Sequence, residues 1–442
     1  MRKSIEIPVT NVKQFTKKLT VFASTLSTSC ILNSNDFPSA IPGCSTNKSI
    51  EFIAALDSVS YISVSSEQKP FEKLYTFWKK NHDWLFGHLS YDLKNSIEKL
   101  SSNHPDYIGF PELFFFQPQF IIEIQNKKAI IWYTDKDNEE TVSALIKKIE
   151  DISETENEEE PVNIQSRFTK QEYIDTIEKI KQHIQCGDIY EMNFCQEFYA
   201  NNVNLDPALL YNKLCELSPA PFSCFYKTEN RFLISASPER FLKKQSHHII
   251  SQPMKGTSVK GANKKENDVL KKQLFENHKE RAENIMIVDL VRNDLSRTAL
   301  PETIRVDELC GIYEFPQVLQ MISTVSSQIS ENTKFTDTIL HAFPMGSMTG
   351  APKIRAMEII EQFEKTKRGL YSGSVGYINP DGDFDFNVVI RSIQYNADSG
   401  YISFQTGGAI TINSDPQMEY EECLIKAQGI NMTLHKKLKV NA

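Results

Sequence analysis

An acidic segment, Ser153–Pro161, is the feature that most restricts how this chain can fold. It holds five glutamates and a proline but no large apolar side chain, so it cannot join a hydrophobic core and predicts a solvated linker. A chain of 442 residues is also too long for one small core. We therefore predict an N-terminal region over residues 1–152, a linker over 153–164 and a larger domain over 165–442.

The overall composition argues against two classes of partner. The formal net charge is −8, whereas a general nucleic-acid binder is normally basic. No run reaches the ~18 apolar residues of a membrane span, and the first residues lack the apolar core of a secretory signal. The eight cysteines form no CxxC pair, so we expect reduced thiols and a cytoplasmic protein that binds neither nucleic acid nor membrane.

Hydrophobic patterns predict a mixture of strands and helices. In the first region Asn126–Lys128 predicts a hairpin turn. In the second, Thr169 and Glu172 have the spacing of a capping box before a helix, and the run 317–329 fits a helix or a strand equally. The expected strands are 29–34, 49–56, 61–66, 120–125, 129–134, 189–200, 223–227, 231–237, 373–378, 384–395 and 401–411, and the expected helices are 141–152, 168–185, 207–217, 262–295 (with a break near its middle), 349–364 and 416–434.

The stretch Ser235–Thr257 predicts two strands with a turn between them, followed by a glycine-containing turn. It brings a carboxylate, Glu239, and an amine, Lys255, into one hairpin. The two groups could form a salt bridge on a surface hairpin, or they could protonate a leaving group and attack an electrophile. These two residues alone do not decide between the alternatives.

Two predicted helices each carry a pair of glutamates three residues apart. Glu280 and Glu283 lie on one of them. The closing helix repeats the spacing with Glu419 and Glu422, followed by Lys426. Because residues three apart share a helix face, two such helices could offer carboxylate oxygens to one Mg²⁺. The alternative is two ordinary solvated faces, with Lys426 in a surface ion pair.

Several other features are compatible with an anionic ligand. The glycine-bearing turn in 343–357 leads into a helix, where free N–H groups favour an anion, although a plain turn would look the same. The strand at 405–410 ends in two glycines, which allow either a close approach of a ligand or a tight turn. Arg391 could face solvent or hold a carboxylate, and Tyr371 could donate a hydrogen bond or pack in the core.

The order of these motifs resembles the chorismate-binding enzymes. This family includes anthranilate synthase component I, aminodeoxychorismate synthase component I, and the isochorismate and salicylate synthases. The resemblance is strong from about residue 165 onward and weaker before it, and it implies an α+β fold of the anthranilate synthase component I type, with antiparallel sheets packed as a central β-sandwich and helices outside. The motifs that carry it are GDIYEMNFCQ, SASPERF, PMKGT, KERAENIMIVDLVRNDL, GSMTGAPKIRAMEII, YSGSVGY, IRSI, QTGGAI and EYEECLIKA.

The resemblance also implies residue roles. It makes Lys255 the nucleophile and Glu239 the general acid of a reaction on chorismate, with Mg²⁺ as cofactor. Expected substrate contacts are Arg391, Tyr371, Gly407, Gly408, Thr349 and Lys426. Expected metal ligands are Glu283 and Glu422, supported by Glu280 and Glu419. Mg²⁺ and Arg391 would lower the pKa of Lys255, an effect that an ionised Glu239 would oppose.

The residue at position 255 separates activities within the family. Lysine there is typical of aminodeoxychorismate synthases, and alanine is typical of anthranilate synthases. The resemblance therefore implies amination of chorismate toward p-aminobenzoate and folate, with ammonia from a separate glutamine amidotransferase; the alternative is anthranilate synthase component I. Two positions depart from the pattern: Gln320 replaces a histidine found in many members, and Glu191 replaces a glutamine and receives no assigned role.

Overall fold

The computed structural model of the protein describes residues 2–35, 37, 51–153, 162–315 and 318–434. Most of the predicted acidic linker lies outside the described residues, so the proposed division of the chain stays a prediction. Val162 and Ile164, which follow it, are buried in a hydrophobic core. Among the helices that the structure describes, none is long and apolar enough to cross a membrane.

The strands form two antiparallel arms, which are joined where one long strand of each arm pairs with the other. All the ladders are antiparallel, and the strands have the bounds β1 Lys3–Pro8, β2 Thr28–Asn33, β3 Phe52–Val64, β4 Leu85–Leu89, β5 Leu113–Gln125, β6 Lys128–Tyr133, β7 Gln165–Ser166, β8 Glu191–Ala200, β9 Phe222–Thr228, β10 Arg231–Ser237, β11 Arg240–Gln245, β12 His248–Gln252, β13 Met254–Val259, β14 Arg305–Glu314, β15 Val318–Gln328, β16 Gly350–Ala351, β17 Ser374–Ile378, β18 Phe384–Asn387, β19 Ser392–Asn396 and β20 Tyr401–Ile410.

The pairings define the path of each arm. In the first arm the order is β3, β2, β9, β10, β19, β20, β8, with β7 and β16 added at the end. In the second arm it is β5, β4, β17, β18, β11, β12, β15, with β13 and β14 on β15. The β3–β5 ladder joins the arms, because β2 uses one half of β3 and β4 uses the opposite half of β5. Residues from both sides of the acidic segment thus pair directly in both arms.

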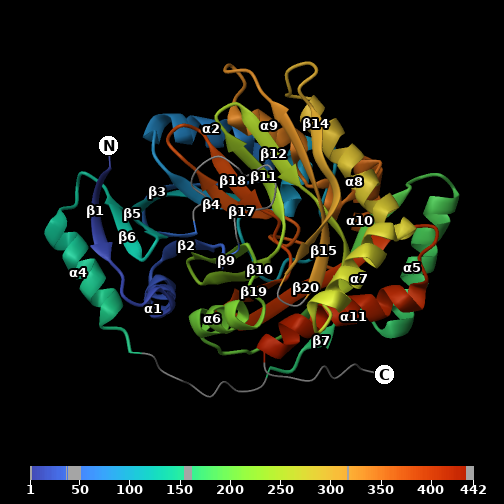
Figure 1. The fold of residues 1–442 in the computed structure, drawn as a ribbon, viewed down its shortest axis with the longest axis horizontal. Helices are drawn as coiled ribbons and strands as arrows, with labels where there is room; N and C mark the ends of the chain where they lie inside the picture. Colours follow the sequence, from blue (N-terminus) through green and yellow to red (C-terminus); the bar gives the residue numbers. More distant parts are fainter. Residues whose placement is uncertain (1, 36, 38–50, 154–161, 316–317, 435–442) are drawn as a thin grey trace.

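The two arms face each other across an apolar interior. Cys30, Cys224 and Leu233 of the first arm pack there against Phe86 and Val375 of the second. This arrangement confirms the predicted β-sandwich with helices outside (Figure 1). Helices α1, α4, α5, α6, α10 and α11 pack on the first arm, and α2, α8 and α9 pack on the second.

The helices begin at side-chain caps in most cases. Their bounds are α1 Val12–Thr25, α2 Pro70–Asn81, α3 Lys94–Ile97, α4 Glu139–Glu150, α5 Lys170–Gln185, α6 Pro207–Leu217, α7 Lys264–Glu276, α8 His278–Ser296, α9 Phe335–Ala342, α10 Lys353–Phe363 and α11 Pro416–Thr433, with short 3₁₀ turns at Ser66–Gln68, Tyr91–Leu93 and Gly346–Met348. The Thr169–Glu172 capping box is present as predicted. The long helix expected over 262–295 is broken at Asn277, whose side chain caps α8.

Several elements differ from the sequence-based expectation or resolve an open one. The two strands expected over 49–56 and 61–66 form one strand, β3. The run 317–329 contains a strand, β15, that is buried on both faces. The helix expected from 349 begins at Lys353, because Gly350 and Ala351 pair with β8. The glycines of QTGGAI lie inside β20 and not at its end. The strand expected over 384–395 is interrupted at 388–391, where the chain leaves one arm for the other.

Candidate active site

The predicted acid lies where the chain crosses from the first arm to the second. Glu239 sits between the end of β10 and the start of β11. A second crossover, between β18 and β19, runs beside it, and the N–H of Val388 donates to the carbonyl of Glu239 at 3.0 Å. The Glu239 carboxylate accepts a hydrogen bond of 2.7 Å from Ser347 Oγ and another from the N–H of Met254, the residue before Lys255.

The environment of Glu239 suits a proton donor. Burial raises the pKa of Glu239 to about 7, although the Ser347 hydroxyl and the charge of Lys255 oppose that rise. A carboxyl with a pKa near 7 retains its proton in a large fraction of molecules at neutral pH, which is the condition for general-acid catalysis. The surface salt bridge that the sequence left open does not fit a side chain that is only 4% exposed.

Lys255 projects from β13 in the second arm toward a carboxylate of the first. Its Nζ lies 3.5 Å from Oε1 of Glu191, the first residue of β8. The Glu191 side chain is buried, and its Oε2 has no hydrogen-bond partner among the described residues. Burial lowers the pKa of Lys255, but Glu191, Glu283 and Glu239 outweigh it and raise the pKa. The direction is opposite to the one expected from the resemblance, because three carboxylates act on this amine.

The backbone beside Lys255 is fixed by an amide side chain. Gln320 Nε2 donates to the carbonyl of Gly256 at 2.8 Å, and Gln320 Oε1 accepts from Thr257 Oγ1 at 3.0 Å. Gly256 has a φ of +92°, a conformation that glycine adopts without strain. The residue that replaces a histidine of many relatives therefore holds the strand that carries Lys255.

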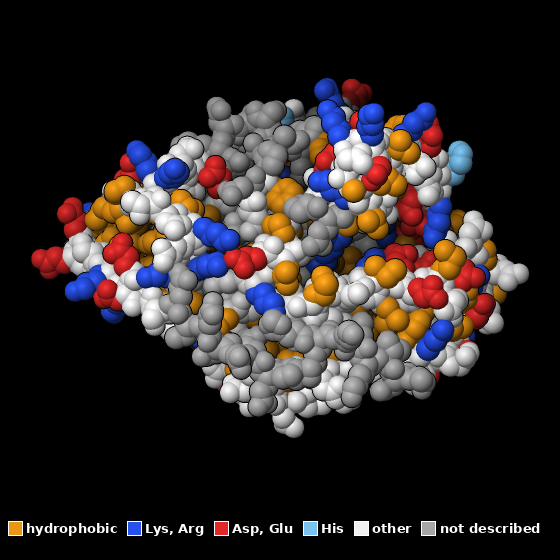
Figure 2. Space-filling model, turned by 60° about the horizontal axis from the view of Figure 1, so that its bottom comes forward, with side chains coloured by type: hydrophobic (Ala, Val, Ile, Leu, Met, Phe, Trp, Pro, Cys, Tyr) orange, Lys and Arg blue, Asp and Glu red, His pale blue; other side chains and the backbone are white. Residues whose placement is uncertain are grey.

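The two pairs of glutamates come together as the sequence suggested. Helix α8 packs on β13 and β15 of the second arm, and α11 packs on β20 of the first. Glu280 and Glu419 lie in the first turns of these helices, where the helix dipole favours negative charge. Acidic side chains line a hollow on the right of Figure 2, on the side where Figure 1 shows α8 and α11.

The cluster is partly neutralised by two lysines. Lys279 Nζ lies 3.6 Å from Glu419 Oε1 and 3.9 Å from Glu283 Oε1. Lys426 Nζ lies 2.7 Å from Glu422 Oε1 and donates to the carbonyl of Gly407 at 2.8 Å. Burial raises the pKa of Glu283 to about 7, although Lys255 opposes it. For Glu422 burial also raises the pKa, but Lys426 overcomes this and the net shift is downward.

The donor set fits a hard divalent cation. Four carboxylates supply oxygen ligands of the kind that Mg²⁺ prefers, and Glu283 Oε1 is buried with no hydrogen-bond partner among the described residues. As the side chains stand, the described part of the chain contains no group of three acidic, histidine or cysteine ligands close enough to hold a metal. The residues therefore fit Mg²⁺ in chemistry, with side-chain adjustment needed to close around it.

The two glycines of β20 have different surroundings. A Cβ on Gly407 would lie 1.9 Å from the carbonyl oxygen of Phe194, so this glycine permits the close β8–β20 pairing. A Cβ on Gly408 would lie 3.1 Å from Glu419 Oε2 and 3.8 Å from Lys426 Nζ. Gly408 thus faces the carboxylate cluster and leaves space beside it.

Arg391 ends the second crossover, with a φ of +50°. Burial lowers its pKa, although Glu239 acts in the opposite direction, and no hydrogen bond or ion pair from its guanidinium to a described residue is found. The carbonyl of Arg391 accepts from the N–H of Ala236 at 3.1 Å, which ties it to the crossover that bears Glu239. The guanidinium is therefore held near Glu239 with its donors available to a carboxylate.

Two other predicted substrate contacts have protein partners. Tyr371 Oη lies 3.5 Å from Cys195 Sγ, and Thr349 Oγ1 donates to the carbonyl of Met345 at 3.2 Å. Both side chains are buried. Their substrate contacts stay predictions, since Thr349 hydrogen-bonds within its own turn and Tyr371 packs in a hydrophobic core beside Cys195.

Three residues of the site carried no assigned role in the sequence. Glu191 and Gln320 stood out only as departures from a family pattern, and Ser347 was one unremarked residue of a glycine-bearing turn. Their roles arise because β8 and β15 meet β13 around Lys255, and the turn before β16 meets Glu239 at the crossover. The spacing of residues along the chain carries no signal for that convergence.

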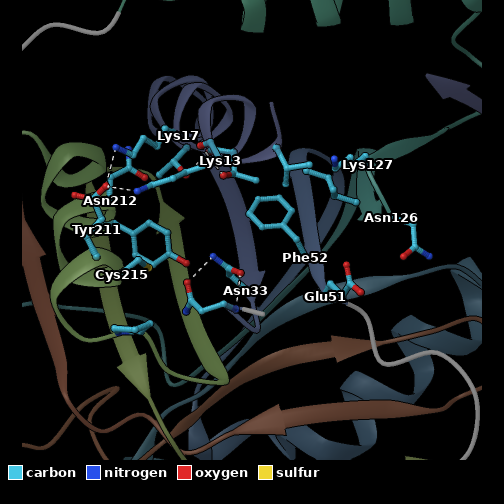
Figure 3. Close-up of a pocket in the computed structure, with 17 residues that line it drawn as sticks. Lys13, Lys17, Asn33, Glu51, Phe52, Asn126, Lys127, Tyr211, Asn212 and Cys215 are labelled. Atoms are coloured by element: carbon cyan, nitrogen blue, oxygen red, sulfur yellow. Dashed lines mark hydrogen bonds and ion pairs between the residues drawn. The ribbon is translucent and has the colours of Figure 1, made fainter. Parts of the chain in front are cut away.

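A separate cavity of about 590 Å³ lies on the N-terminal side of the molecule (Figure 3). Helices α1 and α6 and strands β2 and β3 line it, and Lys13 and Lys17 on its rim pair with Glu216 at 3.1 and 2.9 Å. None of the predicted catalytic or metal-binding residues lines this cavity. The chemistry is therefore assigned to the crossover and the carboxylate cluster.

Residues 30–432 match the family model described as chorismate binding enzyme. The chain belongs to this family. It is accordingly an enzyme of the chorismate-utilising class, which confirms the resemblance drawn from the motifs. The match includes most of β2, all the later strands and the site, but not β1.

Named relatives carry two different activities. Aminodeoxychorismate synthase component 1 of Bacillus subtilis is 32% identical over 360 residues, which are 79% of this chain and 76% of that protein. Anthranilate synthase component 1 of Thermus thermophilus is 31% identical over 354 residues, 78% of this chain and 76% of that protein. The relatives thus define the class of enzyme and leave the product open.

Solved structures show the same fold. Anthranilate synthase component I of Streptococcus pneumoniae superposes with a TM-score of 0.76 at 23% identity, covering 87% of this chain and 94% of that one. The menaquinone-specific isochorismate synthase of Escherichia coli superposes with a TM-score of 0.74 at 14% identity, covering 99% and 95%. The fold is therefore shared by family members that form different products.

Proposed function

We propose that the protein is aminodeoxychorismate synthase component I, which converts chorismate and ammonia to 4-amino-4-deoxychorismate for p-aminobenzoate and folate synthesis. The observation that supports this most is the placement of an amine, Lys255, on the strand whose N–H at Met254 contacts the buried acid Glu239. Amination at C4 with retention of the enolpyruvyl group needs a nucleophile for C2 and an acid for the C4 hydroxyl. Anthranilate synthase, the alternative, would not need Lys255 as a nucleophile.

The proposed reaction has two substitutions. The neutral Lys255 amine attacks C2, the two conjugated ring double bonds shift to C1–C6 and C4–C5, and the C4 hydroxyl leaves as water with the proton of Glu239. Ammonia then attacks C4, both double bonds return to their positions in chorismate, and the Lys255 amine leaves C2. The sum is chorismate plus ammonia giving the 4-amino product plus water, with the proton lost by Glu239 restored from the incoming ammonia.

Binding of chorismate is assigned to the cations and amides around this pair. Arg391 has donors available for the enolpyruvyl carboxylate, and we assign Tyr371 and the backbone at Gly408 to the same region. Mg²⁺ held by Glu283 and Glu422, with Glu280 and Glu419 nearby, would hold the ring carboxylate and neutralise charge beside Lys255. Lys426 and Thr349 complete the proposed contacts. Ammonia would come from a glutamine amidotransferase partner.

The product identifies the function. The purified protein, supplied with chorismate, Mg²⁺ and ammonium, should form 4-amino-4-deoxychorismate, which an added lyase converts to p-aminobenzoate. Liquid chromatography with mass detection measures both compounds. Formation of anthranilate without an added lyase would overturn the proposal and favour anthranilate synthase.

A further inference from the structure

The Lys279 amine lies among the four proposed metal ligands. It lies within ion-pair distance of Glu283 on its own helix and of Glu419 on α11, and the charges of Glu280 and Glu422 also act on it. No other described lysine pairs with carboxylates from both helices. One positive charge therefore links the two helices.

The contacts of Lys279 are of a kind that can be exchanged. Its ion pairs measure 3.6 and 3.9 Å, which is longer than a charge-assisted hydrogen bond, and no hydrogen bond from its Nζ to the described part of the chain is found. Its side chain is 48% exposed, so the amine can reach solvent by rotation of its own stem. Lys426 is different, because it is also bound to the Gly407 carbonyl.

We infer that Lys279 is a displaceable internal cation that occupies the carboxylate cluster when Mg²⁺ is absent and competes with Mg²⁺ for it. This inference rests on the proposed function, because it takes the four glutamates as the metal site. Two helices that bring four carboxylates together repel each other unless a cation lies between them. The lysine supplies that charge at a cost in metal affinity.

The inference predicts that removing the charge tightens metal binding. Isothermal titration of the full-length protein with MgCl₂ should give a dissociation constant about three- to tenfold lower for Lys279→Met than for the wild type, since each partly exposed ion pair that is broken contributes modestly. Without Mg²⁺ the thermal midpoint of Lys279→Met should fall, and saturating Mg²⁺ should raise it more than in the wild type. Lys279→Arg keeps the charge and should bind Mg²⁺ as the wild type does.

A matched control is available on the neighbouring helix. Lys272 of α7 forms an exposed pair with Glu276 at 3.9 Å, and Lys272→Met should leave Mg²⁺ affinity unchanged. Equal or weaker Mg²⁺ binding by Lys279→Met would overturn the inference while leaving the metal site in place. Absence of Mg²⁺ binding in the wild type and in every variant would overturn the inference and the metal assignment together, whereas the proposed product is tested separately.

Discussion

The two halves of the site are built differently. Glu239 and Lys255 stand on a strand crossover and on β13, held by the Ser347 hydroxyl, the Met254 N–H and Gln320. The four glutamates stand on the first two turns of two helices that pack on opposite arms. The first half is positioned by protein hydrogen bonds, while the second is held by ion pairs to Lys279 and Lys426, of which those of Lys279 are exchangeable.

This difference indicates which half of the site the protein can hold in place without a bound metal ion. The acid and the amine have their proposed partners in place and need no further atom to define their geometry. The carboxylate cluster has an excess of negative charge that Lys279 and Lys426 only partly offset. We therefore expect substitutions in the crossover to change the chemical step, and substitutions in the cluster to change the response to Mg²⁺.

The largest expected effect is at Lys255. Lys255→Met removes the proposed nucleophile and should lower the rate of 4-amino-4-deoxychorismate formation on the order of 10³-fold or more, with chorismate binding retained. Steady-state kinetics and equilibrium chorismate binding measure the two quantities. Retention of most of the activity would show that Lys255 is not the nucleophile of the reaction.

Glu239→Gln should lower kcat/KM by roughly 10²- to 10³-fold, because a proton donor is lost. The pH profile should change as well. In the wild type, raising pH produces neutral Lys255 while Glu239 keeps its proton, so kcat/KM rises until the Glu239 pKa of about 7. Above pH 7, deprotonation of Glu239 offsets the increase in neutral Lys255, so kcat/KM stops rising. In Glu239→Gln the rise should continue past pH 7, and an unchanged break near 7 would contradict the assignment.

Glu283→Gln is the corresponding test of the cluster. It removes one charge from the proposed metal site and should raise the Mg²⁺ concentration needed for half-maximal activity about 10- to 100-fold, while activity at saturating Mg²⁺ falls less. A Mg²⁺ titration of activity gives both values. An unchanged Mg²⁺ requirement would remove Glu283 from the metal site.

Glu191→Gln should have the smallest effect, and in the opposite direction. The carboxylate of Glu191 helps to raise the pKa of Lys255, so its loss lowers that pKa and increases the neutral amine. We expect kcat/KM near pH 8 to rise by up to about tenfold, since one pKa unit is a factor of ten. A large fall would instead show that Glu191 accepts the proton of Lys255 during the reaction.

Much of the fold could be predicted because the signals are local. The Thr169–Glu172 capping box and the Asn126–Lys127 turn, whose φ angles of +49° and +61° suit a tight hairpin, depend on neighbouring residues. Strand β15 could not be distinguished from a helix, since it is buried on both faces and shows no alternation. The positive φ of Arg391 has no sequence signal in a residue that is not glycine.

The parts of the site that could be predicted are those marked by a pattern within a single helix or strand. The helix spacing of the glutamates and the family motifs indicated the acid, the lysine and the carboxylate cluster. The contacts of Glu191 and Gln320 with Lys255 and its neighbours join strands of different arms or of different hairpins. Such contacts depend on the tertiary path of the chain, as does the net rise in the Lys255 pKa.

The covalent state of Lys255 tests the central claim most directly. Wild-type protein incubated with chorismate and Mg²⁺ but without ammonia should gain a mass equal to chorismate less one water in intact-protein mass spectrometry. Peptide mapping should place the adduct on Lys255, ammonium should discharge it, and Lys255→Met should not form it. An adduct that survives in Lys255→Met, or amination by a wild-type protein that never carries an adduct, would contradict the account.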